Sequence, residues 1–364
     1  MELNEKRGRG VIDRYRNYLP VSEKTPVISL GEGDTPLIFS TRLSEKVGRD
    51  CKVYIKYEGL NPTGSFKDRG MTVAVSKAME QGTETLLCAS TGNTSASAAA
   101  YAARAGIRCV AVLPAGKIAT GKLVQAFAYG AKIVAIDGNF DDALRIVREL
   151  GERKDFTIVN SINPDRIEGQ KTAAFEIVDE LGDAPRFHLL PVGNAGNISA
   201  YWRGYREYHA AKRSTLLPRM LGFQAAGAAP IFHGRIVERP ETIASAIRIG
   251  NPASWKEASN ALHDSAGKID IVTDEEILSA QRWLAKNEGI FVEPASAASL
   301  AGFFKCCEKR DAAYPFTEIE SSSRIVCTVT GHGLKDPDIW SERIQKLTPV
   351  APNERDVLRA LDSE

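Results

Sequence analysis

The chain has 364 residues, of which 43% are hydrophobic and 26% charged, a composition that is ordinary for a globular protein and leaves room for one large domain or two. Its formal net charge of +1 gives no long-range field that would attract nucleic acid or an anionic membrane surface. No apolar run approaches the ~20 residues of a membrane span, and the start of the chain lacks the apolar core of an export signal, so we expect a cytoplasmic protein.

Short apolar strands alternate with helical patterns along the chain. A strand over residues 53–57 and a helix over 68–78 come first. Further strands are predicted at residues 85–89, 108–113, 132–136, 157–159, 188–192, 220–223, 269–272 and 324–329, and helices at residues 93–104, 140–150, 170–181, 198–211, 274–287 and 295–306. Near-continuous apolar strands indicate burial on both faces, which predicts an α/β architecture with doubly wound, mostly parallel sheets. Ligand sites of such sheets lie at the carboxyl ends of strands.

Lys67 is the first candidate for chemistry. It follows turn residues at Asn61, Pro62 and Gly64 and opens the predicted helix. Backbone N–H groups and the positive end of the helix dipole both disfavour an extra positive charge there. A neutral amine, the form that attacks a carbonyl, is therefore favoured.

Two other interpretations of Lys67 fit the sequence less well. A phosphate-binding P-loop needs Gly-Lys-Ser/Thr after its spacer, and the run Gly-Ser-Phe-Lys-Asp at residues 64–68 does not fit that pattern. A solvated surface lysine would be the better choice for an isolated residue. Polar Gly/Asn/Ser/Thr loops that recur at later strand ends argue against it.

The loop at residues 90–95 reads Ser-Thr-Gly-Asn-Thr-Ser and precedes a helix of small residues. Hydroxyls, an amide and free N–H groups at a helix start form a site for a carboxylate or a phosphate. Plain helix capping needs one such residue and not five, so we favour the binding interpretation.

The loop at residues 193–197 reads Gly-Asn-Ala-Gly-Asn and also precedes a helix. Its glycines allow the backbone to wrap around an anion, whose charge the helix dipole favours. The spacing is not that of a dinucleotide-binding loop, and no acidic ribose partner is evident, so a simple phosphate fits better. A glycine-rich turn alone is a weak signal.

Further polar groups follow other strands. Thr330, beside glycines, could exchange one hydrogen bond with a ligand ring. Asn160, Ser161, Arg166 and Lys122 could form a second anion site, although either cation alone would more often be a surface charge. Six cysteines contain no CxxC pair and five histidines form no ligand-spaced set, so we expect buried free thiols and no metal.

A pyridoxal-phosphate site needs four parts, and the sequence offers a candidate for each: a reactive lysine, a phosphate loop, a carboxylate loop and a hydroxyl for the ring nitrogen. The run Asn-Pro-Thr-Gly-Ser-Phe-Lys-Asp-Arg-Gly at residues 61–70 resembles the Schiff-base segment of the fold type II, or tryptophan synthase β-like, pyridoxal-phosphate enzymes. Over residues 31–338 the chain resembles the threonine synthase family of the shorter bacterial kind. The runs that carry this resemblance are 90–95, 160–164, 168–172, 191–197, 227–230, 292–299 and 328–336.

The resemblance implies an activity, a cofactor and a role for each motif. The activity is conversion of O-phospho-L-homoserine and water to L-threonine and phosphate, by γ-elimination and then β-addition of water. Lys67 would hold pyridoxal 5'-phosphate and act as a mobile base. The remaining roles are cofactor contacts for Asn93, Gly193, Asn194, Ala195, Gly196, Asn197 and Thr330, substrate-carboxylate contacts for Ser90, Thr91 and Thr94, and substrate-phosphate contacts for Lys122, Asn160, Ser161 and Arg166.

The resemblance also implies a division of the chain. A smaller α/β domain would span about residues 68–160, and residues 1–67 with 161–364 would form a larger one, with the cofactor in the cleft between them. A homodimer is implied as well. Two alternatives stay open: a related dehydratase or β-replacement synthase, which needs no second phosphate site, and a non-catalytic protein that binds a phosphorylated metabolite, which gives Lys67 no task.

Overall fold

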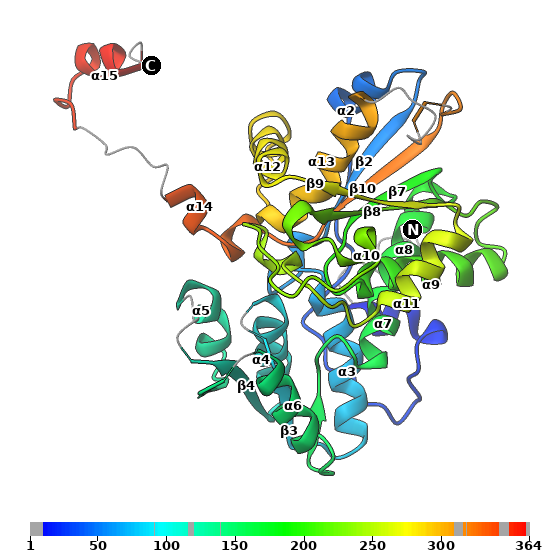
Figure 1. Ribbon diagram of the computed structural model, residues 1–364, viewed down its shortest axis with the longest axis vertical. Coiled ribbons are helices and arrows are strands. Elements are labelled where there is room, and N and C mark those ends of the chain that lie inside the picture. The colour runs from blue at the N-terminus through cyan, green and yellow to red at the C-terminus, as the bar shows by residue number, and fades with distance from the viewer. Residues whose placement is uncertain are drawn as a thin grey trace.

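The computed structural model describes residues 10–90, 92–115, 120–138, 140–308, 316–317, 319–341 and 349–361; the side chains at 120–122, 140, 141 and 341 also lie outside this description. The described strands form a six-stranded sheet in the order β1-β2-β10-β7-β8-β9 and a four-stranded sheet in the order β5-β4-β3-β6. The smaller sheet and its helices occupy the lower part of Figure 1, and the larger sheet the upper part.

The larger sheet is parallel except at one edge. Its strands are β1 (Leu37–Ser40), β2 (Lys52–Tyr57), β7 (Phe187–Pro191), β8 (Arg219–Ala225), β9 (Lys268–Val272) and β10 (Arg324–Val329). Only β1 runs antiparallel, against β2. The central strand β10 pairs in parallel with β2 on one side and with β7 on the other. The turns that follow β2, β10 and β7 therefore meet at one edge of the sheet.

The smaller sheet is parallel throughout. Its strands are β3 (Thr85–Cys88), β4 (Arg108–Pro114), β5 (Lys132–Ile136) and β6 (Phe156–Ile158). Strand β3 pairs with β4 and β6, and β4 pairs with β5. All four strands lie inside the predicted smaller domain at residues 68–160. The borders of that domain stay a prediction.

Helices cover both faces of each sheet (Figure 1). Those around the smaller sheet are α3 (Lys67–Glu80), α4 (Asn93–Ala105), α5 (Thr120–Ala128) and α6 (Phe140–Leu150). The others are α1 (Gly10–Tyr15), α2 (Thr41–Val47), α7 (Pro164–Gln170), α8 (Thr172–Leu181), α9 (Gly196–Ala210), α10 (Pro230–His233), α11 (Trp255–Asp264), α12 (Asp274–Glu288), α13 (Pro294–Glu308), α14 (Asp338–Ser341) and α15 (Glu354–Leu361). Short 3-10 turns are η1 (Arg16–Tyr18), η2 (Glu58–Leu60), η3 (Ala226–Ala228), η4 (Ser245–Ile247) and η5 (Gly333–Lys335).

Separate apolar clusters stabilise the two sheets. Phe303 of α13 belongs to the cluster on one face of the larger sheet, and Phe175 of α8 to the cluster on the other. Tyr101 of α4 and Val147 of α6 lie in the two clusters of the smaller sheet. Burial on both faces explains the uninterrupted apolar strands, and it confirms the predicted doubly wound architecture.

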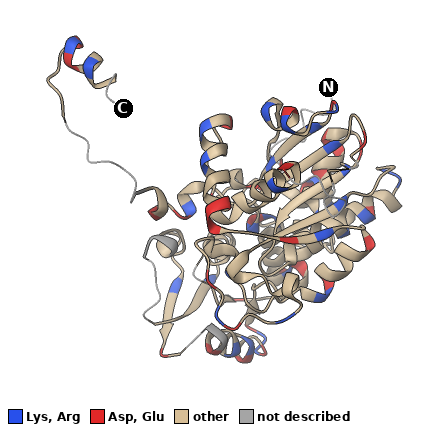
Figure 2. Cartoon of the chain, turned by 45° about the horizontal axis from the view of Figure 1, so that its top comes forward, with Lys and Arg blue, Asp and Glu red and all other residues tan. Residues whose placement is uncertain are grey.

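The surface carries no single dominant charge. Basic and acidic positions are interspersed over the described chain in Figure 2, in keeping with the net charge of +1. Among the described helices, none has the length and apolar character that crossing a membrane requires. In helix α15, Val357, Leu358 and Leu361 are exposed, so the described chain does not show this helix docked.

Candidate functional site

Lys67 is the first residue of α3 and faces the loop that follows β10. The chain leaves β2 through η2 and a turn in which the Gly64 N–H donates to the Asn61 carbonyl over 2.8 Å. Gly64 adopts a φ of +85°, which favours glycine. The Phe66 N–H then donates to the Thr330 carbonyl over 3.0 Å. This bond fixes the lysine beside the predicted ring-nitrogen contact.

The pKa of the Lys67 amine lies near neutral pH. The pKa of Lys67 is lowered to about 7: burial is the largest cause, the positive charge of Arg166 adds to the lowering, and Glu293 opposes both. Within the described chain the ammonium has no ion-pair partner, and it lies 4.1 Å from the centre of the Phe66 ring. The helix start at Lys67 predicted a lowered pKa, and the direction of the shift agrees. Its chief causes are burial and Arg166.

The lowered pKa predicts how the amine reacts. Above a pH of about 7 the neutral form of Lys67 should dominate, whereas an ordinary lysine stays protonated until about pH 10.4. In the cofactor-free protein, an acylating reagent should therefore label Lys67 with a midpoint near pH 7. Peptide mapping against pH measures this, with exposed Lys52 as an internal reference. A shared midpoint for the two lysines would contradict the prediction.

Asn93 and Glu293 join the two halves of the site. Asn93 begins α4, and its Nδ2 donates to the Glu293 carboxylate, at 2.9 Å from Oε1 and 3.1 Å from Oε2. Both residues are buried, and burial raises the pKa of Glu293. The Glu293 N–H donates to the Gly331 carbonyl over 3.1 Å. The amide predicted to contact the cofactor is thereby tied to the Thr330 loop.

Ser296 organises that loop. Its Oγ lies 3.0 Å from Thr330 Oγ1, and it accepts the N–H of Thr330 over 3.0 Å and that of Gly331 over 2.7 Å. Glu293 and Ser296 were not predicted as site residues, although the run 292–299 was recognised. The usable signal was a carboxylate and hydroxyls placed beside Pro294 in an otherwise small and apolar segment.

The loop at 193–197 offers unpaired donors. No backbone N–H of residues 193–196 donates a hydrogen bond to another described residue. Ala195 has a φ of +66°, and α9 begins at the next residue. A Cβ on Gly193 would lie 2.9 Å from the Cα of Ile247, so only glycine allows this approach. The Nδ2 of Asn197 donates to the Pro191 carbonyl over 2.9 Å. Free N–H groups at a helix start suit a phosphate.

Arg166 of α7 is a buried cation that has no counter-ion in the described part of the chain. Its Nη1 donates to the Val159 carbonyl over 3.0 Å, its Nε has no hydrogen-bond partner, and no described carboxylate pairs with it. Burial lowers the pKa of Arg166 to about 10. An unpaired buried charge is costly, and a bound anion would compensate it.

Close helix packing fixes Arg166 relative to Lys67. A Cβ on Gly169 would lie 1.9 Å from the Arg69 carbonyl oxygen, and a Cβ on Gly70 would lie 2.6 Å from that of Arg166. Helices α3 and α7 therefore touch through their backbones. This contact carries the guanidinium to the region of the amine, as its effect on the pKa of Lys67 shows.

The other predicted substrate contacts differ in burial, and two of them lie outside the described part of the chain. Asn160 is buried, and its amide exchanges two hydrogen bonds with the backbone of Ala89, of 3.0 and 2.9 Å. Ser90 and Ser161 are partly buried, as is Thr94 at the start of α4. Thr91 and the side chain of Lys122 lie outside the described part of the chain. Ser90, Thr94, Asn160 and Ser161 all follow β3 or β6, which are adjacent strands.

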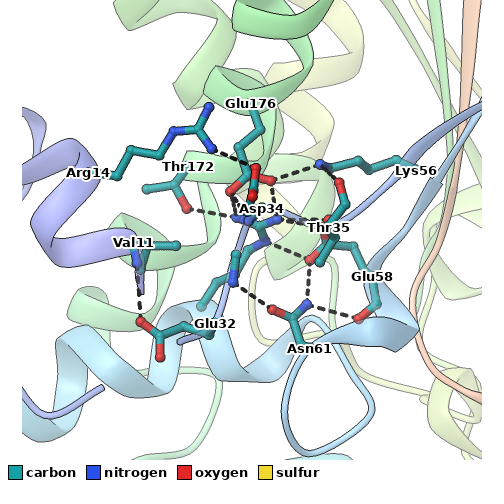
Figure 3. A network of polar contacts seen from close by, with 12 residues as sticks. Val11, Arg14, Glu32, Asp34, Thr35, Lys56, Glu58, Asn61, Thr172 and Glu176 are labelled. Carbon is teal, nitrogen blue, oxygen red and sulfur yellow. Dashed lines mark hydrogen bonds and ion pairs between the residues drawn. The ribbon is translucent and has the colours of Figure 1, made fainter. Parts of the chain in front are cut away.

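A buried charge network connects Lys56, Glu58 and Glu176 through Arg69, which lies two positions after Lys67 in the chain (Figure 3). Arg69 donates to Glu58 through Nε and Nη2 over 2.6 and 2.8 Å, and to Glu176 through Nη1 and Nη2 over 2.7 and 2.6 Å. Lys56 donates to Glu176 over 2.8 Å. Burial opposes ionisation of Glu176, but Arg69 and Lys56 outweigh it and hold the pKa of Glu176 well below its usual range. Two cations balance two carboxylates here.

Comparisons with known proteins agree with this geometry. The family described as "Pyridoxal-phosphate dependent enzyme" matches residues 28–331. The chain is 57% identical over 346 residues to a threonine synthase of Halalkalibacterium halodurans, with 95% of each chain covered. It is 53% identical over 334 residues to one of Methanocaldococcus jannaschii, covering 89% of this chain and 80% of that one.

Solved structures share the fold. Maize serine racemase aligns with a TM-score of 0.72 and 24% identity over 85% of this chain and 91% of that one. Diaminopropionate ammonia lyase of Escherichia coli aligns with a TM-score of 0.73 and 18% identity, covering 86% of this chain and 88% of that one. At these sequence identities the similarity is evidence for the fold alone, and it confirms the predicted fold type.

The described residues fit pyridoxal phosphate. A partly buried lysine with a lowered pKa suits a carbonyl partner, and the unpaired N–H groups of residues 193–196 suit its phosphate. These two features follow β2 and β7, and Thr330 follows β10 between them. Arg166 remains as a second buried positive charge that the phosphate loop does not use. The arrangement can therefore hold one anion at the loop and another near the amine.

Proposed function

Because the chain belongs to the pyridoxal-phosphate dependent enzymes of the threonine synthase family, we propose that it converts O-phospho-L-homoserine and water to L-threonine and phosphate. The observation that carries the proposal is Arg166, a buried guanidinium near the amine of Lys67 that pairs with no carboxylate among the described residues. A substrate that brings its own phosphate would supply the missing negative charge.

Pyridoxal phosphate, when bound, withdraws electrons from the substrate and so lets protons leave carbon. Lys67 would carry those protons. It would take them from Cα and Cβ and return one at Cγ after phosphate leaves. Water would then add its hydroxyl at Cβ, a proton would return to Cα, and the remaining proton would leave with the phosphate. A base that works in both directions needs a pKa near the working pH, and the pKa of Lys67 is about 7. Its flexible stem lets one amine reach successive carbons.

The neighbouring groups would hold the reactants in place. The 193–197 loop would bind the cofactor phosphate, Asn93 the phenolic oxygen, and Thr330 the ring nitrogen. Ser90, Thr91 and Thr94 would hold the substrate carboxylate. Arg166, Lys122, Asn160 and Ser161 would hold the leaving phosphate, where a cation stabilises the developing charge. Since both ends of the Asn160 amide already bond Ala89, we assign Arg166 the larger share.

Arg166→Met tests this assignment. The variant should keep normal cofactor content, since the 193–197 loop is untouched. Its kcat/KM on O-phosphohomoserine should fall roughly ten- to a hundredfold, because that is the effect of losing one charge-assisted hydrogen bond to the substrate. Part of the loss should appear in kcat, because the leaving group gains charge during the reaction. Inorganic phosphate should become a weaker inhibitor. Steady-state kinetics with both ligands measures these effects.

Arg148→Met is the matched control, because Arg148 is an exposed arginine of α6. It should behave like the wild type. If Arg166→Met instead lost its cofactor, or kept full sensitivity to phosphate, the second anion site would be misplaced. Turnover of serine or threonine by a protein indifferent to O-phosphohomoserine would favour the dehydratase or β-replacement alternative.

We also propose that the enzyme works as a homodimer in the cytoplasm. The resemblance to the family supports the dimer, and the ordinary composition and free cysteines support a reducing compartment. Light scattering of the purified holoenzyme at micromolar concentration tests the first part. A monomer under those conditions would refute it.

A further inference from the structure

Lys335 joins three separate parts of the site. It ends η5, a few residues after Thr330. Its Nζ donates to the Thr63 carbonyl over 3.0 Å and to the Oε1 of Gln125. Thr63 belongs to the turn that leads to Lys67, and Gln125 lies on α5 beside the smaller sheet. One ammonium thus contacts the turn that follows β2 of the larger sheet and a helix beside the smaller sheet.

The stem of Lys335 has a preformed place. It lies across Gly64, where an added Cβ would be 3.2 Å from Lys335 Cδ. The φ of +85° at Gly64 also disfavours any other residue. The bare glycine backbone therefore leaves room for the lysine stem to pass over the turn. The direction of this side chain is set by packing as well as by its hydrogen bonds.

The two acceptors of Lys335 are neutral. Within the described chain no carboxylate forms an ion pair with its ammonium, although Glu293 and Asp68 are near enough to oppose the lowering of its pKa by burial. A hydrogen bond from a charged donor is stronger than one between neutral groups. Because Lys335 is partly buried, loss of either acceptor would leave part of the charge without compensation.

Helix α5 is placed where its position affects the site. It packs against α4, which begins at Asn93. It follows β4, whose carboxyl end lies at the same edge as that of β3. The first turn of α5 contains Lys122, one of the proposed substrate-phosphate contacts. On one side α5 contacts α4. The hydrogen bond from Lys335 also connects α5 directly to the loop that follows β10 of the larger sheet.

We propose that Lys335 is a positioning residue that holds α5 against the turn before Lys67, and that it promotes substrate binding through α5 without touching the substrate. The part that concerns the substrate rests on the proposed function. The tie between Lys335 and Gln125 does not, so the two can be tested apart.

Hydrogen exchange of the holoenzyme tests the tie without any substrate. Lys335→Met keeps the stem and removes the ammonium, and Gln125→Leu removes the acceptor while keeping a good helix former. Amides of residues 120–128 should exchange several-fold faster in both variants than in the wild type. Val124→Ala, at an exposed position of the same helix, is the control and should exchange like the wild type. Unchanged exchange in Lys335→Met would overturn the proposal.

Kinetics tests the consequence. Each variant should raise KM for O-phosphohomoserine roughly tenfold, with a smaller change in kcat and an unchanged cofactor spectrum. The double variant should be no worse than Lys335→Met, because both changes break the same tie. Additive losses would show that the residues act separately and would overturn it. If the wild type did not turn over O-phosphohomoserine, the proposed function would fail, and the exchange result would still decide on the tie.

Discussion

Replacing Lys67 by alanine is expected to abolish turnover while leaving the protein folded and partly loaded with cofactor. The variant loses the amine that would move protons at three carbons, and loss of a positioned acid–base costs roughly a hundred- to ten-thousandfold. The unpaired N–H groups of residues 193–196 would still bind the cofactor phosphate. Phosphate release from O-phosphohomoserine and cofactor absorbance, measured on the same purified sample, give both quantities.

Lys52→Ala is the control for this experiment, because Lys52 is an exposed lysine of β2. It should keep the activity and colour of the wild type. If Lys67→Ala turned over substrate at more than a trace of the wild-type rate, Lys67 would not be the base. If it unfolded, Lys67→Gln would repeat the test with a polar side chain.

Removing Arg69 is expected to give a large loss of stability. Arg69→Met removes the ion pairs of Arg69 with Glu58 and Glu176. Lys56 stays paired with Glu176, and no other cation among the described residues forms an ion pair with Glu58 (Figure 3). Breaking a buried ion pair from one side costs about 3–5 kcal/mol, because the remaining charge is left uncompensated. The free energy of unfolding, from a denaturant titration of the cofactor-free protein, should fall by about that amount. Arg69→Lys should recover only part of it, since lysine lacks the planar fork.

An exposed ion pair provides the comparison. Arg145 and Glu149 lie 2.9 Å apart on α6, with about three-fifths of each side chain exposed (60% and 61%). Solvent screens such exposed pairs and they contribute little, so Arg145→Met should change stability little. If Arg69→Met cost no more than Arg145→Met, the network would not stabilise the fold as its geometry indicates.

Periodicity along the sequence predicted the parallel sheets closely, because strands buried on both faces leave uninterrupted apolar runs. The helix expected from Asp68 in fact begins at Lys67, one residue earlier. The edge strand β1 was missed, since it is short and pairs on one side only. Helix α7 was missed because Asn163 and Pro164 read as a turn, whereas Asn163 caps the helix and Pro164 opens it.

Tertiary contacts explain what the sequence could not give about the site. Arg69 meets Glu176 across 107 positions, and Asn93 meets Glu293 across 200, so no local pattern marks these pairs. The burial of Arg166 depends on the approach of two helices through Gly70 and Gly169. The motifs themselves could be recognised in the sequence, because each is a polar run that follows a predicted apolar strand. The carboxyl ends of parallel strands lie at one edge of a sheet, so these runs were expected to lie close together.

The central claim is tested most directly by following the fate of oxygen. The purified holoenzyme is incubated with O-phospho-L-homoserine in heavy-oxygen water, and the products are analysed by mass spectrometry. Addition of water at Cβ predicts L-threonine and phosphate in equal amounts, with solvent oxygen in the threonine hydroxyl and none in the phosphate. Homoserine with labelled phosphate, a keto acid in place of threonine, or no reaction at all would contradict the proposed function.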